Sequence, residues 1–273
     1  REKNHILKLK LTPKIFPKWS EHGKVQLYFS SEEKKRGLIL LEKLGIKAND
    51  HWICIHNRDS AYLNKALPNR GPQQYGNWAH HNYRDFSVKS MLPAAEFFIN
   101  KGYHVIRMGA AVNEKIFTES KDSKVIDYVN SELRDDFSDM YLLTNCKAYL
   151  GSDSGTSQVP YIFKKPFYFV NFSSTLIHVL TDYCPFLFIF KRIKNLKNNQ
   201  MLTLRDILKS NFAYTSSTYD FEKNNLEPID NSSDDIKSLA LEIEREFRNQ
   251  TYMDKEDLKI QKEFWKIYYK YVD

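Results

Sequence analysis

The sequence predicts an α/β protein in which helices flank a parallel sheet. Short, largely apolar runs have the length and composition of strands that are buried on both faces, and they lie at residues 52–55, 103–106, 148–150 and 167–170. Segments with apolar residues at helical spacing separate these runs, and polar residues follow the first three directly. Such alternation is typical of a parallel sheet, because neighbouring parallel strands require a crossover connection.

The first predicted helix begins after Ser30 and ends near Gly45. Ser30 and Glu33 have the spacing of a capping box, in which each side chain accepts a hydrogen bond from the backbone N–H of the other. The residues before this helix are basic and are broken by Pro13 and Pro17, so we expect irregular structure there. The first strand comes soon after the helix.

A long polar loop follows the first strand, from Ser60 to about Asp85. It is longer than most connections in compact domains, which indicates a functional or mobile segment. Residues 87–101 predict a helix, with Pro93 in its first turn and Gly102 as its C-cap signal. The second strand comes directly after this glycine.

The second half of the chain repeats the pattern as far as Val170 and then becomes less regular. Residues 133–145 predict a helix, and a shorter helix ends near Phe163. Three later helices are predicted at residues 202–209, 232–247 and 255–271. We therefore divide the chain into an N-terminal segment, an α/β domain and C-terminal helices, at residues 1–50, 51–230 and 231–273.

The composition is that of a folded globular protein with an anionic partner. The 273 residues are 42% hydrophobic and 27% charged, which argues against disordered chains, collagen-like repeats and coiled-coil rods. Lys and Arg outnumber Asp and Glu by 41 to 34, and this formal net charge of +7 suits an anionic ligand or surface. The cysteines are odd in number and lack C-x-x-C spacing, so we predict no disulfide framework, metal site or cofactor; they are Cys54, Cys146 and Cys184.

The sequence also predicts where in the cell the protein is located. No apolar run reaches the roughly 18 residues that a membrane-spanning helix needs, and no signal-peptide pattern opens the chain. The predicted location is therefore the cytoplasm, with the inner face of the membrane as a site of peripheral association. Because the chain begins at Arg1 rather than Met, we expect that a preceding portion has been removed or left out.

Polar residues after three of the predicted strands are candidates for an anion site. Ligands of parallel sheets bind beyond the carboxyl ends of the strands, where Arg58, Arg107 and the turn at residues 151–155 lie. An arginine can form a fork to a phosphate, and a glycine–serine turn before a helix presents backbone N–H groups. The alternatives are a salt bridge to Asp59 or Asp85 for the arginines, and an ordinary strand-to-helix connection for the turn.

The end of the long loop adds a further arginine. Arg84 follows His80 and His81, and it can close over a ligand from this position. Adjacent histidines in a loop are more often ordinary exposed residues, and these two, with Asp85, lack a further ligand motif elsewhere in the chain. The loop therefore favours an anion site over a metal site.

Taken together, these segments resemble a family of bacterial glycosyltransferases encoded in surface-carbohydrate gene clusters. The resemblance spans most of the chain and rests on residues 45–46, 53–59, 81–86, 102–109, 152–155 with Pro160, 165–171, 202–208 and 231–236. The stretch from His56 to Asp59 is also similar to the H-x-R-x-D region of fucosyltransferase-like enzymes, whose arginine contacts the donor diphosphate. The chain departs from these patterns where Asp59 directly follows Arg58, and where Asp85 replaces an expected Asn.

The resemblance implies a Rossmann-like, GT-B-like C-terminal lobe that binds a nucleotide sugar over residues 51–230, with a reduced or missing N-terminal lobe. It implies metal-independent transfer of a sugar to a cell-surface glycan or a related, lipid-linked acceptor. The positions that we predict for donor binding, from the strand ends together with the resemblance, are His56, Arg58, Arg84, Arg107, Gly109, Ser152, Asp153, Ser154, Gly155 and Thr156. The candidates for the general base that activates the acceptor hydroxyl are Asp59, His81 and Asp85.

Two other functions compete with this hypothesis. The first is a noncatalytic nucleotide- or carbohydrate-binding lobe of a larger assembly. The second is a nucleic-acid binder, suggested by the basic charge and the 14% aromatic content. We do not predict a nucleic-acid partner, because no RNA- or DNA-binding motif interleaves the basic residues.

Overall fold

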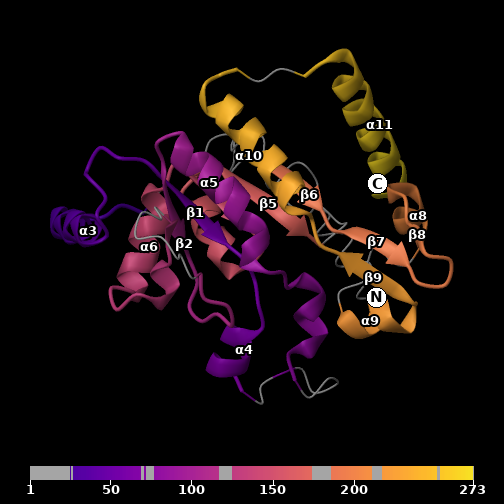
Figure 1. The fold of residues 1–273 in the computed structure, drawn as a ribbon, viewed down its shortest axis with the longest axis horizontal. Coiled ribbons are helices and arrows are strands. Elements are labelled where there is room, and N and C mark those ends of the chain that lie inside the picture. The colour runs from indigo at the N-terminus through magenta and orange to yellow at the C-terminus, as the bar shows by residue number, and fades with distance from the viewer. Residues whose placement is uncertain are drawn as a thin grey trace.

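A six-stranded parallel sheet forms the centre of the protein in the computed structural model, which describes residues 25, 27–68, 71, 77–116, 125–173, 186–210, 217–250 and 253–272 (Figure 1). The strands lie in the order β3-β2-β1-β4-β5-β6 and all pairs are parallel. Their bounds are Trp52–His56 (β1), His104–Arg107 (β2), Val125–Ile126 (β3), Ala148–Gly151 (β4), Phe167–Phe172 (β5) and Phe186–Phe190 (β6). The predicted α/β fold with a helix-flanked parallel sheet is confirmed.

The strand order creates a topological switch between β1 and β4. From β1 the chain proceeds outward to β2 and β3, and it then returns to β4 on the other side of β1 and proceeds outward to β5 and β6. Because the two halves lead away from each other, a crevice opens beyond the carboxyl ends of β1 and β4. This crevice is where open parallel sheets bind their ligands.

Helices cover both faces of the sheet. Along β1, Cys54 packs on one face, whereas Ile53 and Ile55 pack on the other, because successive strand residues alternate between faces. The Cys54 face is covered by α3 (Ser31–Lys43) and α6 (Asp136–Asn145), and the opposite face by α5 (Leu92–Asn100) and α10 (Ser233–Phe247). In Figure 1, α5 and α10 lie side by side over the sheet.

The first helix agrees with its prediction in detail. The Glu33 backbone N donates to Ser30 Oγ at 3.2 Å, and the Ser30 backbone N donates to Glu33 Oε2 at 2.7 Å. The chain leaves the helix through Gly45, which has a φ of +74° that suits glycine. The capping box read from the sequence is therefore confirmed.

Two later helices begin after the residues that the sequence predicts. The helix predicted at residues 87–101 is divided in two. A 3₁₀ turn, η2 (Val88–Met91), comes first, and α5 then begins at Leu92 with Pro93 in its first turn. α6 begins at Asp136 because the Asp135 carboxylate accepts a hydrogen bond from the Ser138 N at 2.6 Å and caps the helix. The predicted long loop contains a helix and a 3₁₀ segment, α4 (Ala61–Ala66) and η1 (Ala79–Arg84).

The region after β5 holds structure that the sequence does not predict. β6 extends the parallel sheet, and a separate antiparallel sheet has the order β8-β7-β9. Its strands are short and largely polar, so they carry little periodicity. The elements of this region that the sequence does not predict are β7 (Arg192–Asn195), β8 (Gln200–Met201), α9 (Thr218–Lys223) and β9 (Leu226–Ile229). The helices predicted at residues 202–209, 232–247 and 255–271 are confirmed as α8 (Leu204–Lys209), α10 and α11 (Lys255–Val272). The remaining elements are η3 (Tyr128–Asn130), η4 (Gly155–Ser157) and α7 (Gln158–Ile162).

Some expectations fall outside the described residues. These are the irregular structure before Ser30, for residues 1–24, and the environment of Cys184. The proposed domain boundaries stay a prediction.

Candidate functional site

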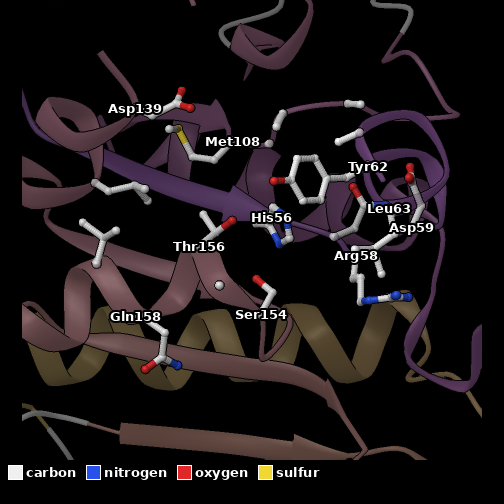
Figure 2. A pocket seen from close by; sticks show the side chains of 18 of the residues that line it. His56, Arg58, Asp59, Tyr62, Leu63, Met108, Asp139, Ser154, Thr156 and Gln158 are labelled. Carbon is white, nitrogen blue, oxygen red and sulfur yellow. The ribbon is translucent and has the colours of Figure 1, made fainter. Parts of the chain in front are cut away.

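A cavity of about 1040 Å³ opens beyond the carboxyl ends of β1 and β4. It lies on the α6 side of the sheet, which is the face of Cys54 and Met108. Figure 2 shows Arg58, Ser154 and Thr156 around this space. The cavity therefore occupies the topological switch that the strand order creates.

Ten of the thirteen predicted site residues line this cavity. They come from the end of β1, the long loop, the end of β2 and the turn after β4, and they are His56, Arg58, Asp59, His81, Arg84, Gly109, Asp153, Ser154, Gly155 and Thr156. The other three do not line it: Asp85, Arg107 and Ser152. Parallel pairing of β1 with β2 and β4 brings together these segments, which are distant in the sequence.

β1 and β4 approach each other closely at Gly151. A Cβ at this position would lie 2.3 Å from the His56 carbonyl oxygen, so only glycine fits. The next residue, Ser152, donates from its backbone N to that same oxygen at 3.0 Å, and its Oγ lies 3.1 Å from His56 Nδ1. Ser152 therefore positions His56 from behind the cavity lining.

His56 is a neutral imidazole at pH 7. Burial lowers its pKa to about 3, and the positive charges of Arg107 and Arg58 act in the same direction. Its ring stacks on Tyr149, with 6.3 Å between the ring centroids. His56 thus offers hydrogen bonding and a flat surface to the cavity, and no positive charge.

Arg58 reaches the cavity while the end of the long loop holds it. Its guanidinium pairs with the Asp85 carboxylate and donates to the His81 carbonyl oxygen at 3.1 Å. Burial raises the pKa of Asp85 to about 6, although the Arg58 charge opposes this change. The salt bridge considered as an alternative for Arg58 is therefore present, and Arg58 lines the cavity as well.

Arg84 connects the long loop to the turn after β4. Its guanidinium donates to the Asp153 carbonyl oxygen. Burial raises the pKa of the Asp153 carboxyl group, while the Arg84 charge opposes this change. The turn itself is closed by Ser157, whose backbone N and hydroxyl donate to the Ser154 carbonyl oxygen at 3.1 and 2.7 Å.

Gly155 borders open space within this turn. A Cβ built on it would meet no atom within 4 Å, and Gly155 lines the cavity. A bound group can therefore approach the backbone here more closely than any side chain would allow.

The three candidate bases differ in how they are engaged. The Asp59 carboxylate accepts hydrogen bonds from Ala61 N at 2.8 Å and Asn113 N at 2.9 Å, and the Asp85 carboxylate pairs with Arg58. Within the described residues, His81 Nδ1 is buried without a hydrogen-bond partner.

The His81 ring is also neutral at pH 7. Burial, together with the nearby His80, Arg58 and Arg84 charges, lowers its pKa to about 4. Trp78 lies parallel to this ring, with 6.1 Å between the centroids. Of the three candidates, His81 is therefore the one that lines the cavity and has a ring nitrogen without a hydrogen-bond partner among the described residues.

Arg107 does not face the cavity, which corrects the expectation that it shares a cleft with Arg58. Its side chain is 0% exposed, and it donates to the Glu114 carbonyl oxygen at 2.7 Å and to Asn57 Oδ1 at 3.1 Å. It also pairs with the Asp127 carboxylate at 3.3 Å. Arg107 thus joins three segments inside the protein and has no free face for a ligand.

Side chains at and before the start of α6 also reach the cavity, and the sequence did not predict them. Arg134 donates from Nε to the Gly109 carbonyl oxygen at 2.8 Å, and it pairs with Asp139 at 2.8 Å. Burial raises the pKa of Asp139, while the Arg134 charge opposes this change. A helix that precedes a parallel strand begins at the carboxyl edge of the sheet, and this rule could have placed Asp136 and Met140 in the lining.

The long loop supplies a different part of the lining. In Figure 2, Tyr62 and Leu63 of α4 lie on one side of the cavity, and Asp139 and Gln158 lie on the other. The sequence analysis expected a functional loop at this position, although it did not single out Tyr62 or Leu63.

The described residues contain neither a cluster of metal-binding side chains nor a helix that could span a membrane. No group of three or more His, Cys, Asp or Glu side chains among them could hold a metal ion. None of the helices in that part of the chain has the length and apolar character needed to cross a bilayer.

No family model and no curated protein sequence matches this chain. Two solved structures are similar to part of it. One is a glycosyl transferase family 9 protein from Veillonella parvula, with a TM-score of 0.43 and 12% identity, covering 60% of this chain and 42% of that one. The other is the E. coli ADP-heptose LPS heptosyltransferase II, with a TM-score of 0.37 and 17% identity, covering 59% and 44%. The matched region thus spans less than half the length of either structure.

Proposed function

We propose that this protein is a glycosyltransferase that moves a sugar from a nucleotide-sugar donor to a glycan or a related, lipid-linked acceptor. The observation that carries the proposal is that Arg58, Arg84 and the Ser154–Thr156 turn line one cavity at the topological switch of a parallel sheet. The motif resemblance to surface-carbohydrate glycosyltransferases involves these same segments. Both lines of support favour an anionic nucleotide ligand at this cavity.

The proposed chemistry depends on stabilising a leaving diphosphate. As the bond between the anomeric carbon and the diphosphate oxygen breaks, its electrons remain on the diphosphate, where negative charge grows. The guanidinium groups of Arg58 and Arg84 would neutralise this charge without a metal ion, and backbone N–H groups at Gly155 and Thr156 would donate to it. Asp85, which pairs with Arg58, would act as a positioning residue.

We assign the role of general base to His81. A neutral imidazole can accept the proton of the acceptor hydroxyl as that oxygen bonds to the sugar. The uncommitted Nδ1 of His81 supports this assignment, whereas the Asp59 and Asp85 carboxylates are already engaged. Negative charge from a bound donor would also raise the pKa of His81 from about 4 toward neutral pH.

A noncatalytic nucleotide- or carbohydrate-binding lobe is the second candidate function. The Asp59 and Asp85 carboxylates already have hydrogen-bond or ion-pair partners, so few groups in the cavity are left to accept a proton. This arrangement favours a lobe that binds its ligand without catalysis. Binding of nucleotides without any turnover, by a correctly folded protein, would support this candidate.

A thermal-shift screen with UDP, GDP, CMP, dTDP and ADP tests the proposed site, because a ligand of the native state raises the melting temperature. The matching nucleotide sugars are then assayed for hydrolysis and transfer. We expect Arg58→Ala to reduce both the thermal shift and turnover strongly, and the exposed Arg192→Ala to retain them as a charge-matched control. Equal behaviour of the two variants would contradict the proposal.

A further inference from the structure

A basic stripe runs along α11 and lies outside the proposed donor cavity. Its lysines are spaced by four, three, four and four residues, so they follow one line of the helix surface: Lys255, Lys259, Lys262, Lys266 and Lys270. The last four, together with Arg205 and Lys209 of α8, line a groove of about 580 Å³. The groove and the donor cavity have no lining residue in common.

The aromatic face of α11 fixes the direction of this stripe. Tyr268 is buried against the α8 residue Leu208, and the ring of Phe264 lies 6.3 Å from Phe190 of β6. In Figure 1, α11 stands beside α8 at the edge of the molecule. The lysines, all of them exposed, therefore face away from the protein.

Acidic side chains do not balance this charge. In the part of the chain that the structure describes, no ion pair involves any basic residue of the groove, and Glu263 is its one acidic lining residue. A cluster of like charges repels itself unless an anionic partner lies opposite it. The groove therefore suits a partner with several negative charges.

An apolar strip lies next to the lysines on the same helix. Leu258, Trp265 and Tyr269 are spaced by seven and four residues, and the rings of Trp265 and Tyr269 stack with 5.5 Å between centroids. Leu258 is 43% exposed and Tyr269 is 50% exposed. Lysines beside leucine and amphipathic aromatic residues are typical of helices that lie in the headgroup region of a bilayer.

We propose that α11 and α8 attach this protein to a membrane surface that contains anionic lipids. The lysines of the stripe contact lipid phosphates, and the strip of Leu258, Trp265 and Tyr269 enters the headgroup region. The combination of charge with an adjacent leucine-containing strip favours a membrane over a nucleic acid. This inference is independent of the chemistry at the donor cavity.

Co-sedimentation with vesicles tests the proposal. We expect the full chain to bind vesicles of phosphatidylcholine and phosphatidylglycerol at about three to one, to bind pure phosphatidylcholine weakly, and to dissociate at high salt. The variant K259E/K262E/K266E should partition on the order of a hundredfold less, because each basic residue near an anionic surface contributes independently. The variant L258S/Y269S should also bind more weakly.

Charge-matched controls make the outcome decisive. The variant K34E/K35E/K43E alters three exposed lysines of α3 by the same net charge, and we expect it to bind vesicles like the wild type. Equal losses in both triple variants would overturn the proposal, because net charge alone would then explain binding. So would tight binding of a single-stranded RNA oligonucleotide by the wild type without vesicle binding. Circular dichroism and unchanged melting temperatures without ligand would show that each variant is folded.

Discussion

Arg58 and Arg107 lie at the ends of neighbouring strands of the sheet, yet their environments differ. Arg58 lines the cavity and has one carboxylate partner, Asp85. Arg107 is fully buried and bonds to three separate segments. The register pairs Arg107 with Ile55, whose side chain packs on the α5 side of the sheet, away from the cavity.

The difference shows that the face of the sheet decides the role of a residue at a strand end. Successive residues alternate between faces, so a shift of one position separates a group that faces the ligand from an internal one. Arg107 braces the ends of β1 and β2, and Arg58 stands where a ligand would arrive. Mutating Arg107 should therefore lower the stability of the fold, whereas mutating Arg58 should lower the affinity for the ligand.

The largest expected effect is the loss of stability in Arg107→Ala. Removing this guanidinium leaves Asp127 and the polar atoms of Asn57 and Glu114 without their internal partner, and breaking a buried ion pair costs about 3–5 kcal/mol. Urea denaturation of the variant and of Arg58→Ala measures this cost. A smaller loss of unfolding free energy for Arg107→Ala than for Arg58→Ala would contradict the comparison.

The second effect concerns affinity at the other arginine. Under the proposed function, Arg58→Ala should weaken binding of the donor by about 30- to 150-fold, because a charge-assisted hydrogen bond contributes about 2–3 kcal/mol. Isothermal titration with the best nucleotide sugar measures this loss. Arg107→Lys, if folded, is the matched control, and an equal loss of affinity there would show that Arg58 has no special contact.

Asp85 gives this prediction a pH dependence. Its pKa of about 6 means that its carboxylate becomes neutral as the pH falls through that value, which frees Arg58 from its partner. The phosphates of a nucleotide sugar keep their charge in this range, so donor affinity should rise several-fold on acidification. Asp85→Asn should bind the donor with the higher affinity both above and below the Asp85 pKa of about 6. A pH dependence that persists in Asp85→Asn would assign it to another group.

Gly151, at the end of β4, and Gly155, in the turn that follows it, provide the third test. Gly151→Ala forces a Cβ against the His56 carbonyl oxygen and should destabilise the fold by about 1–3 kcal/mol. Gly155→Val projects into open space and should leave the unfolding free energy unchanged, while it blocks nucleotide binding sterically. Thermal melting and calorimetric titration of both variants separate these effects. A folded Gly155→Val variant with unchanged affinity would show that the turn is only a connector.

The sequence predicts the edge of the sheet correctly, because strand ends and turn glycines are local features. The apolar runs of β1 and β4 and the small residues after Leu150 suffice to bring Arg58 and Gly155 to one edge. The direction of Arg107 depends on which face carries the cavity, and that is set by the helices packed on each side. No local pattern contains this information.

Other features depend on contacts between distant segments. Arg134 reaches the cavity because it bonds to the Gly109 carbonyl oxygen, a contact that only the assembled sheet creates. The short antiparallel strands after β6 pair with each other and bury Ile193 and Leu226 against α8 and α9, and they carry little signal of their own. The apolar stretch from Phe186 to Phe190 had the composition of a strand, but its place in the sheet depends on pairing with β5.

The smallest expected effect concerns His56, which is half-buried beside both arginines. Its folded-state pKa of about 3 lies below the ordinary value of 6.5, so the unfolded chain binds more protons between these values. The stability contributed by neutral His56 is therefore complete above about pH 6.5 and is lost as the pH falls toward 3. Asp85 opposes this trend, because its raised pKa makes the folded state bind the additional proton. The difference between wild type and His56→Gln isolates the histidine, since Asp85 is present in both.

We expect the unfolding free energy of the wild type to fall relative to that of His56→Gln by about 1 kcal/mol between pH 7 and pH 5.5. Urea denaturation of both proteins at several pH values measures the change. Parallel curves would show that the folded state accommodates a charged imidazole between Arg58 and Arg107. The end of β1 would then be more open to water than its burial indicates, and the contrast between a ligand-facing arginine and an internal one would be weaker than we infer.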